Sequence, residues 1–420
     1  MSEPGGPRAI LGDRAVRTII LINFLVMVGF GLIAPILPLF ARSFGVGLEA
    51  AGLLISAFAI ARLVFDLAAG PIVDRFGERV SAATGLGIVA VSSALTGLAP
   101  TFTLAVLFRA AGGAGSSILF AALYSYVLKT VPKDRMGRTL SLFYGSFNAG
   151  IIAGGPLGGV IAHALGLRAP LFAYAGVLVL AAMLYLVYVR DPPRTAIEGP
   201  LTIEHALIER EAPIRRAASQ RVMERLRDRR LIGVLIVNLS YFWIIAGVYD
   251  TLVPLFGSEA LGMSAVAIGG VFSIALATES IVLYPSGKAA DTIGRKPVMV
   301  FSLVGVVTVT AVIGLAGSPL MLGLMLGLMG IVAGVAGVPP AAMLSDIVPE
   351  EASGTAVGLF RFAGDLGFVL GPLVAGYTSR ALGFTAAFAI AAVMPAIALV
   401  AVLVTPETLA TRRRLRSGEL

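Results

Sequence analysis

The stretch GPIVDRFGER at residues 70–79 recurs 217 positions later as GKAADTIGRK at residues 287–296. Other landmarks repeat at the same spacing or at one residue less: PLF at 38–40 and 254–256, VP at 131–132 and 348–349, and GP at 155–156 and 371–372. Repetition at one long period indicates that two copies of the same structural unit follow each other along the chain. The fold is therefore expected to be a duplication.

The composition around these repeats is typical of membrane helices. Of the 420 residues, 57% are hydrophobic and 13% are charged, whereas soluble proteins carry about 25% charged residues. The 50 glycines and 23 prolines lie within apolar stretches, which membrane helices tolerate. A crossing needs about 20 apolar residues. Twelve such stretches are present, at 18–40, 49–71, 81–101, 103–128, 139–163, 169–189, 231–256, 265–286, 297–316, 319–345, 355–378 and 381–404.

The basic residues predict the orientation of these spans. Cytoplasmic loops carry an excess of lysine and arginine, and 26 of the 32 basic residues fall on one side when the N-terminus is placed in the cytoplasm. We therefore expect a multi-pass protein of a bacterial inner or plasma membrane, in contact with membrane lipids, with both termini cytoplasmic. The net charge of +8 then reflects topology, so no nucleic-acid partner is expected.

The predicted fold class is an all-α membrane protein of twelve transmembrane helices in two pseudo-symmetric six-helix bundles. A basic segment between the two bundles, from Ile214 to Arg230, is interpreted either as a helix lying on the inner leaflet or as a solvated tether. The expected parts are a cytoplasmic N-tail at 1–17, the first bundle at 18–189, a cytoplasmic basic linker at 190–230, the second bundle at 231–404 and a cytoplasmic C-tail at 405–420.

Several kinds of chemistry are excluded by residues that the chain lacks. It has no cysteine and only two histidines, which excludes thiolate metal sites and makes a histidine-built metal site implausible. There is no P-loop pattern and no serine–histidine arrangement, so we expect no enzyme, no cofactor and no metal. A non-transporting, receptor-like membrane protein is the alternative of a different class.

Residues 70–79 resemble the loop signature G-x-x-x-D-R-x-G-R-K of the major facilitator superfamily of secondary transporters, and the resemblance extends over essentially the whole chain. Glu78 departs from the signature, which has a basic residue there, whereas the second copy keeps Arg295 and Lys296. The resemblance implies a conformational latch that forms and breaks, because an aspartate and an arginine at a helix end can bridge to a neighbouring helix. The alternative is that the arginines only set topology. The latch residues are Gly70, Asp74, Arg75, Gly77, Arg79, Gly287, Asp291, Gly294 and Arg295.

Three motifs resemble those of proton-coupled members, and of the drug:proton antiporter branch in particular. RAAGGAG at 109–115 is similar to R-x-x-Q-G-x-G, with Gly112 in place of the glutamine. Pro35 and Pro38 match a P-x-x-P pattern in the first span. GGPLGG at 154–159 resembles G-P-x-x-G-G but is one residue short. Either a role in coupling direction or plain helix packing accounts for its small residues, which are Gly154, Gly155, Pro156, Gly158 and Gly159.

The resemblance implies a function by alternating access, with the substrate bound between the bundles of a monomer. The motifs favour proton-coupled efflux of a small amphipathic compound or drug. The alternative is proton-linked transport of a metabolite such as a sugar or an organic acid. The expected partners are therefore a small-molecule substrate and protons.

Four charged residues within the spans form two pairs with helical spacing, Arg62 with Asp66 and Arg361 with Asp365. Each pair can neutralise itself along one helix face. Alternatively, because the second and eleventh spans pack together in the resembled fold, the four form a cluster that joins the two bundles on the cytoplasmic side and opens when the cavity faces inward.

Arg109, Asp250 and Glu279 have no such local partner, and charged residues within a membrane are functional candidates by default. We expect these three to serve in proton coupling or substrate binding, with Glu279 near the middle of its span as a proton carrier. Further candidates lie on the first and seventh spans, which line the cavity in the resembled family. These cavity-lining residues are Pro35, Asn238, Tyr241 and Trp243.

Overall fold

The computed structural model describes residues 14–130, 133–189, 228–347 and 353–407. The helices of the first half are α2 (Arg14–Ile33), α3 (Leu37–Arg42), α4 (Leu48–Phe76), α5 (Glu78–Leu98), α6 (Phe102–Thr130), α7 (Lys133–Leu165) and α8 (Ala169–Tyr188). Those of the second half are α10 (Arg229–Trp243), η2 (Ile244–Leu252), α11 (Val253–Glu259), α12 (Ala265–Thr292), α13 (Arg295–Ile313), α14 (Pro319–Gly337), α15 (Pro339–Ile347), α16 (Ser353–Ala391) and α17 (Val393–Val404). The predicted tails and linker lie for the most part outside the described residues and stay predictions.

Ten helices within the described residues are long and apolar enough to cross a membrane. One of them, 358–404, has 47 residues and would extend about 70 Å if straight, more than twice the hydrocarbon thickness of about 30 Å. It is interrupted at Gly383, whose φ of 81° suits glycine, and therefore supplies two crossings. The first crossing is formed by α2 and α3 together. The predicted all-α fold with twelve crossings is thus confirmed.

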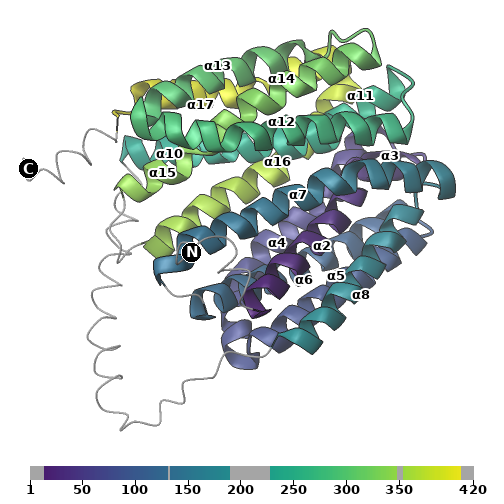
Figure 1. Cartoon of the computed structure of the whole chain (residues 1–420). Coiled ribbons are helices and arrows are strands. Elements are labelled where there is room, and N and C mark those ends of the chain that lie inside the picture. The colour runs from purple at the N-terminus through teal and green to yellow at the C-terminus, as the bar shows by residue number, and fades with distance from the viewer. Residues whose placement is uncertain (1–13, 131–132, 190–227, 348–352, 408–420) are drawn as a thin grey trace, which may run out of the picture.

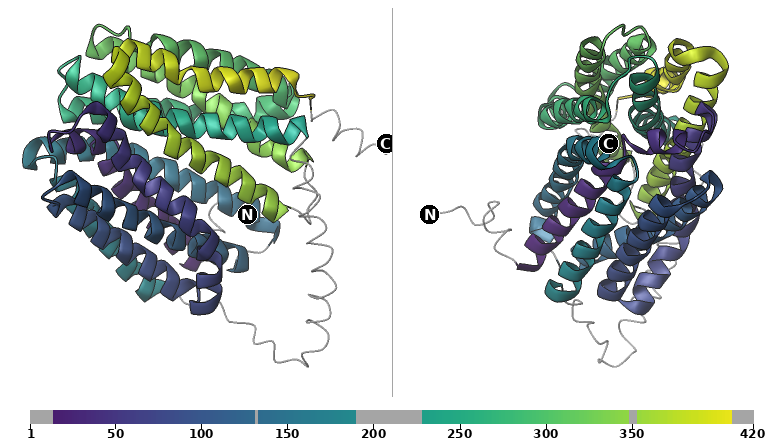
Figure 2. Two further views of the ribbon diagram at one scale, coloured as in Figure 1. Left: turned by 180° about the vertical axis from the view of Figure 1, so that it is seen from behind. Right: turned by 90° about the vertical axis from the view of Figure 1, so that its right-hand side faces the viewer.

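The helices form two bundles, one from each half of the chain (Figure 1). In the first bundle α2 packs on α7 and α8, and α5 packs on α6 and α8; in the second, α12 packs on α14 and α10 packs on α16 and α17. We call "the linker end" the end of the molecule at which α2 begins, α8 ends, α10 begins and α17 ends. The bundles lie close together at the opposite end, and their axes diverge toward the linker end (Figures 1 and 2).

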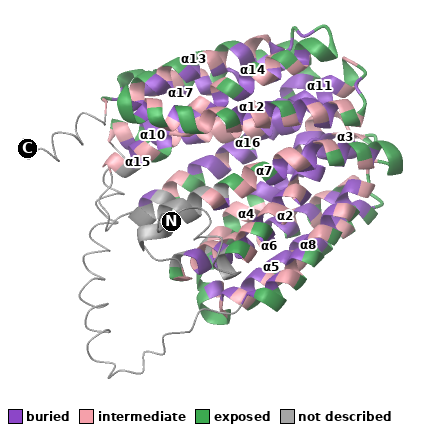
Figure 3. Cartoon of the chain, viewed as in Figure 1, coloured by how far each residue is buried: buried purple, intermediate pink, exposed green. Residues whose placement is uncertain are grey.

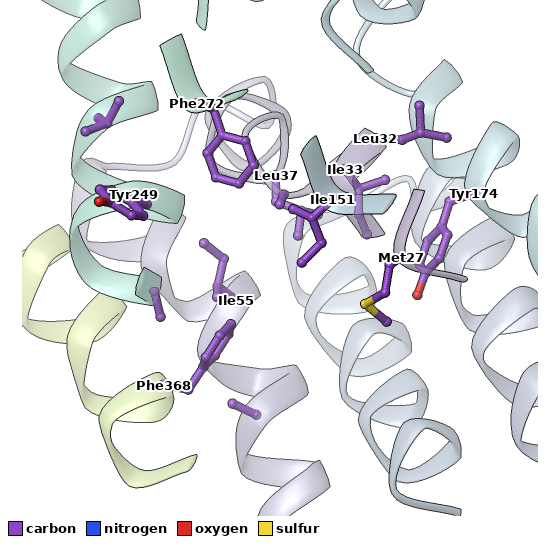
Figure 4. Close-up of a cluster of buried hydrophobic side chains, with 14 of the residues drawn as sticks. Met27, Leu32, Ile33, Leu37, Ile55, Ile151, Tyr174, Tyr249, Phe272 and Phe368 are labelled. Atoms are coloured by element: carbon purple, nitrogen blue, oxygen red, sulfur yellow. The ribbon is translucent and has the colours of Figure 1, made fainter. Parts of the chain in front are cut away.

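Burial differs between the inside and the outside of the bundles (Figure 3). Many large apolar side chains are exposed, among them Tyr284 at 83% and Leu165 at 75% exposure. Soluble proteins rarely expose apolar surface on this scale, so this surface suits hydrocarbon. The buried cluster is also apolar and continues from one bundle into the other, where Ile55 of α4, Phe368 of α16 and Tyr249 of η2 lie together (Figure 4).

The helix pairs that join the bundles include α4 with α16, α7 with α12, and α3 with α11, and η2 also contacts α3 and α4. Glycines permit the approach of their backbones. A Cβ atom on Gly52 would collide with the carbonyl oxygen of Pro372, and one on Gly159 would lie 2.5 Å from that of Ala265. Small residues are the usual means by which membrane helices pack closely, because lipid supplies no hydrophobic force between helices. Both contacts lie toward the opposite end.

The glycine-rich motif of α7 serves two faces of that helix. Gly154 and Gly158 meet the backbone of α2, whereas Gly155 and Gly159 meet the backbone of α12. Pro156 lies within the helix between them. The packing role predicted for this motif therefore has a direct geometric basis: α7 uses one pair of glycines to hold its own bundle together and the other pair to contact the second bundle.

Two helices extend further than the sequence predicts. α4 continues to Phe76 and α12 to Thr292, so most of the signature at 70–79, which was expected to form a loop, is helical. The chain turns only at Gly77, with φ 82°, and at its counterpart Gly294, with φ 130°. These two positions need glycine because other residues rarely adopt a positive φ.

The first crossing of each half is irregular at a corresponding place. Pro35 lies in the break between α2 and α3, and η2, a π-helix, precedes Pro254. Proline lacks an N–H and clashes with the carbonyl group four residues earlier, which interrupts regular α-helix. Single π-turns recur at functional sites, and η2 carries Asp250.

We predict that Gly158→Ala destabilises the protein and that Gly176→Ala does not. The added methyl group of the first variant would collide with the carbonyl oxygen of Leu32, whereas no atom lies within 4 Å of the corresponding position on Gly176. Overpacking of this kind costs about 1–3 kcal/mol. Thermal unfolding of the two purified variants in the same detergent measures the difference. Equal melting temperatures would contradict the packing described for α7.

Candidate functional site

Four intramembrane charges meet across the interface between the bundles. Arg62 of α4 donates to Asp365 of α16, and Arg361 of α16 lies 3.9 Å from Asp66 of α4, measured from Nη2 to Oδ2. The pairs therefore form between helices, as the second interpretation of the sequence proposed, and not along one helix. Asp365 is buried, whereas the side chain of Arg361 is 46% exposed, so the first pair is the better shielded from water.

This charge cluster lies where the contact between α4 and α16 ends. On its inner side Ser56 donates to the carbonyl group of Val369 at 2.7 Å. On its outer side, toward the linker end, neither Gly70 nor Gly358 has an atom within 4 Å of the position that a Cβ would take. The cluster is thus closed in a conformation in which the two helices separate just beyond it.

Two more ion pairs join the bundles at the opposite end. Arg42 of α3 donates from Nε to Oε1 of Glu259 in α11 at 2.7 Å, and Arg380 of α16 donates to Glu49 of α4. Sequence reasoning missed these residues because they lie at span ends, where charge is ordinary. One signal was available: both residues closely follow the repeated PLF stretch, Arg42 by two residues and Glu259 by three.

Arg109 lies inside the first bundle with few partners. It is 2% exposed, its guanidinium carbon lies 4.3 Å from the centre of the Phe58 ring, and its Nε and Nη1 atoms have no hydrogen-bond partner in the described chain. It interacts electrostatically with Tyr174 and with Asp250 of the second bundle. Asp250 is itself 3% exposed. The structure therefore places two of the three predicted coupling residues within range of each other's charge across the interface, without a direct ion pair between them in the described chain.

Glu279, the third of these residues, lies within the second bundle. Its Oε1 accepts a hydrogen bond of 2.5 Å from the hydroxyl group of Tyr241, and its Oε2 is buried without a hydrogen-bond partner in the described chain. A small cavity of about 10 Å³ borders Tyr241 and Tyr249, whose hydroxyl group also lacks such a partner. This volume is close to the minimum for one water molecule. No basic side chain contacts the carboxyl group among the described residues.

Two of the predicted cavity-lining side chains are bonded within the second bundle. Asn238 donates to the carbonyl group of Phe360 at 2.6 Å, and the indole of Trp243 donates to that of Ala391 at 3.0 Å. Their polar groups hold α16 against α10 and are not available to a substrate in this conformation. Tyr241 is bonded to Glu279, and Pro35 forms the break in the first crossing.

The contacts described for the signature residues lie within one half or the other. Arg79 donates to the carbonyl group of Leu186, and Arg295 pairs with Asp291 at 2.5 Å and with Asp346 at 3.3 Å. Asp74 and Arg75 are exposed at the end of α4. The latch across the bundles stays a prediction. No cluster of three or more histidine or carboxylate side chains that could hold a metal ion occurs in the described ranges.

The sequence profile of the Major Facilitator Superfamily matches residues 19–282 and 258–420. The chain belongs to this superfamily. It is therefore a multi-pass membrane protein and a transporter, as its apolar helices also indicate. An uncharacterized MFS-type transporter of Methanocaldococcus jannaschii is 24% identical over 377 residues, which cover 88% of this chain and 92% of that protein.

Other superfamily members share parts of the sequence or the fold. The quinolone resistance protein NorA of Staphylococcus aureus is 26% identical over 186 residues, 44% of this chain and 47% of NorA. The fold resembles a bacterial homolog of the human lysosomal transporter Spinster in an inward-facing, unoccupied conformation, with a TM-score of 0.71, 15% identity and coverage of 93% and 94%. It also resembles the nucleoside transporter NupG, with a TM-score of 0.74, 14% identity and coverage of 93% and 99%.

We predict that Asp365→Asn destabilises this superfamily member far more than Asp66→Asn. The first change leaves Arg62 without its ion partner in a mostly buried place, at a cost of about 3–5 kcal/mol. The second removes a longer contact to a half-exposed arginine, which is worth about 0–1 kcal/mol. Thermal unfolding measures both, and adding Arg62→Gln to Asp365→Asn should recover part of the loss. Equal losses for the two single variants would argue against the pairing.

Proposed function

We propose that the protein exports a small amphipathic compound in exchange for protons, by alternating access between its two bundles. The observation that carries the proton coupling is Glu279, a buried carboxyl group whose one described hydrogen-bond partner is a tyrosine hydroxyl.

Alternating access is supported by the uneven contact between the bundles. Ion pairs and glycine contacts hold them together at the opposite end, whereas Gly70, Gly145 and Gly358 near the linker end face open space. We assign the linker end to the cytoplasm because the basic residues gather there in the sequence. The described conformation is then the inward-facing one, and the outward-facing state requires the pairs Arg42–Glu259 and Arg380–Glu49 to break. The four-charge cluster is formed in this conformation, so it does not open when the cavity faces inward, contrary to the expectation from the sequence.

Proton binding at Glu279 follows from the cost of an unpaired charge in the membrane. An isolated carboxylate within a span costs at least about 2.5–3.5 kcal/mol, and a bound proton removes that charge. The hydrogen bond from Tyr241 holds one oxygen in place, which leaves the other to take the proton. The chain has only two histidines, so a carboxyl group is the natural proton carrier.

Arg109 and Asp250 link the proton to the conformational change. They lie on different bundles and interact across the interface at the closed, opposite end. Opening that end separates them and leaves each charge without its counterpart. Protonation of Asp250 neutralises one of the two, so the outward-facing state is reached more readily with a proton bound.

Export of an amphipathic compound is supported by sequence. The pair Pro35 and Pro38 and the GGPLGG stretch of α7 resemble motifs of the drug:proton antiporter branch, and NorA, a quinolone resistance protein, is similar over about half of the chain. The second candidate is proton-linked transport of an organic acid. It is favoured by Arg109, whose unpartnered N–H groups suit a carboxylate substrate.

We predict that Glu279→Gln abolishes transport driven by a pH gradient while exchange of labelled for unlabelled substrate continues, because the amide cannot carry a proton. Asp250→Asn should impair coupling in the same way. Proteoliposomes with an imposed pH gradient, tested with quinolones and with a panel of sugars and organic acids, measure both effects. Glu279→Asp is the matched control, since it keeps a carboxyl group that can bind a proton and should keep transport dependent on the pH gradient.

A wild-type rate and an unchanged pH dependence in Glu279→Gln and Asp250→Asn would contradict the proton assignment. Accumulation of the organic acids but not of the quinolones would decide for the second candidate. Transport that is independent of the gradient in the wild-type protein would indicate a uniporter.

We also predict that joining residues 42 and 259 stops transport. The chain has no cysteine, so Arg42→Cys with Glu259→Cys introduces the sole pair of thiols. A short, reducible thiol crosslinker should hold the opposite end closed and abolish transport, and a reductant should restore it. The same reagent should join Gly70→Cys to Gly358→Cys poorly, because the helices separate there. Full transport by the crosslinked protein would contradict the proposed gate.

A further inference from the structure

Two ion pairs occupy corresponding places in the two bundles with their charges exchanged. In the first bundle Lys129 donates from Nζ to Oε1 of Glu78 at 2.5 Å. In the second, Arg295 donates from Nε to Oδ2 of Asp346 at 3.3 Å. Glu78 corresponds to Arg295 and Lys129 to Asp346, each 217 positions later. The acidic residue of the first pair thus corresponds to a basic residue in the second pair, and the basic residue corresponds to an acidic one.

The structural context of the two pairs is also the same. Glu78 is the first residue of α5 and Arg295 is the first residue of α13, each directly after a glycine with positive φ. Lys129 is the second-last residue of α6, and Asp346 is the second-last residue of α15. Each pair therefore ties the third crossing of a half to the linker end of the fourth. Three of the four side chains, all except Lys129, are at most 6% exposed.

One neighbour of the first pair also differs between the halves. Glu78 accepts a hydrogen bond of 2.8 Å from Ser125, whereas the position that corresponds to Ser125 is Ala342, which has no hydroxyl group. Arg295 also pairs with Asp291 at 2.5 Å, and the counterpart of Asp291 in the first half, Asp74, is likewise an aspartate. The exchange of charge therefore concerns the two members of each pair, and both members are exchanged together.

The exchange has a consequence for every wrong combination of these helix ends. If α5 were placed against α15, Glu78 would face Asp346; if α13 were placed against α6, Arg295 would face Lys129. Both wrong combinations bring like charges together in a poorly hydrated place, whereas both native ones bring opposite charges together.

We propose that this exchanged charge pair specifies which helices pack together within each half, and so prevents mispairing between the two duplicated halves as the chain folds. Duplicated units present similar surfaces, so attraction alone does not discriminate between them. Repulsion in the wrong combination supplies the discrimination. The inference concerns assembly and is independent of the substrate and of the coupling ion.

The test compares three variants of the full chain. The first exchanges the charges of the first half (Glu78→Arg with Lys129→Asp), the second those of the second half (Arg295→Glu with Asp346→Lys), and the third combines all four changes. In the first two, the native pairs persist but the wrong combinations become attractive. In the third, the wrong combinations are repulsive again.

We expect the first two variants to give a several-fold lower yield of monodisperse protein after detergent extraction, and the third to give a several-fold higher yield than the second. The folded fraction of the first variant should melt near the wild-type temperature, since its exchanged pair keeps opposite charges. The second and third variants also lose the ion pair of Arg295 with Asp291 and should share a lower melting temperature. Lys129→Asp alone, which puts two acids together, should lower both yield and melting temperature. A wild-type yield from the first variant would overturn the proposal, and so would a fourfold variant whose yield does not exceed that of the second.

Discussion

Hydrocarbon offers no hydrogen bond to a backbone group and little solvation to a charge, and the arrangement of this chain follows from that constraint. Helices satisfy their own backbones, so the bundles are held together by close approach at glycines such as Gly52 and Gly158. A charged side chain inside the membrane is stabilised when an opposite charge lies beside it. Arg62 and Asp365 form such a pair across the interface, at the point where α4 and α16 separate.

Much of the fold follows from patterns that a single sequence carries. The repeat at 217 residues and the apolar spans predict two bundles of six crossings, because both depend on composition along the chain. Features that depend on local backbone geometry could not be predicted from the sequence. α4 and α12 continue through most of the signature because the chain turns only at Gly77 and Gly294. The π-helix η2 has no distinctive sequence of its own, although Pro254 follows it.

The candidate site, like the fold, could be predicted from the sequence only in part. Residues that the membrane should exclude, such as Arg109, Asp250 and Glu279, could be named from the sequence because burial of a charge is costly anywhere in a span. Their partners could not, since a carboxyl group within a span does not reveal which helix faces it. Asn238 and Trp243 lie on the expected helix, but a helix has several faces, and theirs turn toward α16. The helical spacing of Arg62 and Asp66 fitted pairing along one helix as well as pairing between helices. The structure shows that the pairs form between helices.

Arg42 and Glu259 are the last residues of corresponding helices of the duplication, α3 and α11, and they touch. Two equivalent helix ends of a molecule with approximate twofold symmetry can meet only close to its symmetry axis. Their contact therefore marks the place where the pseudo-twofold axis emerges at the end away from the linker. Any path along this axis between the bundles is therefore bordered at that end by one guanidinium and one carboxylate. A solute with separated positive and negative charges can interact with both of these groups.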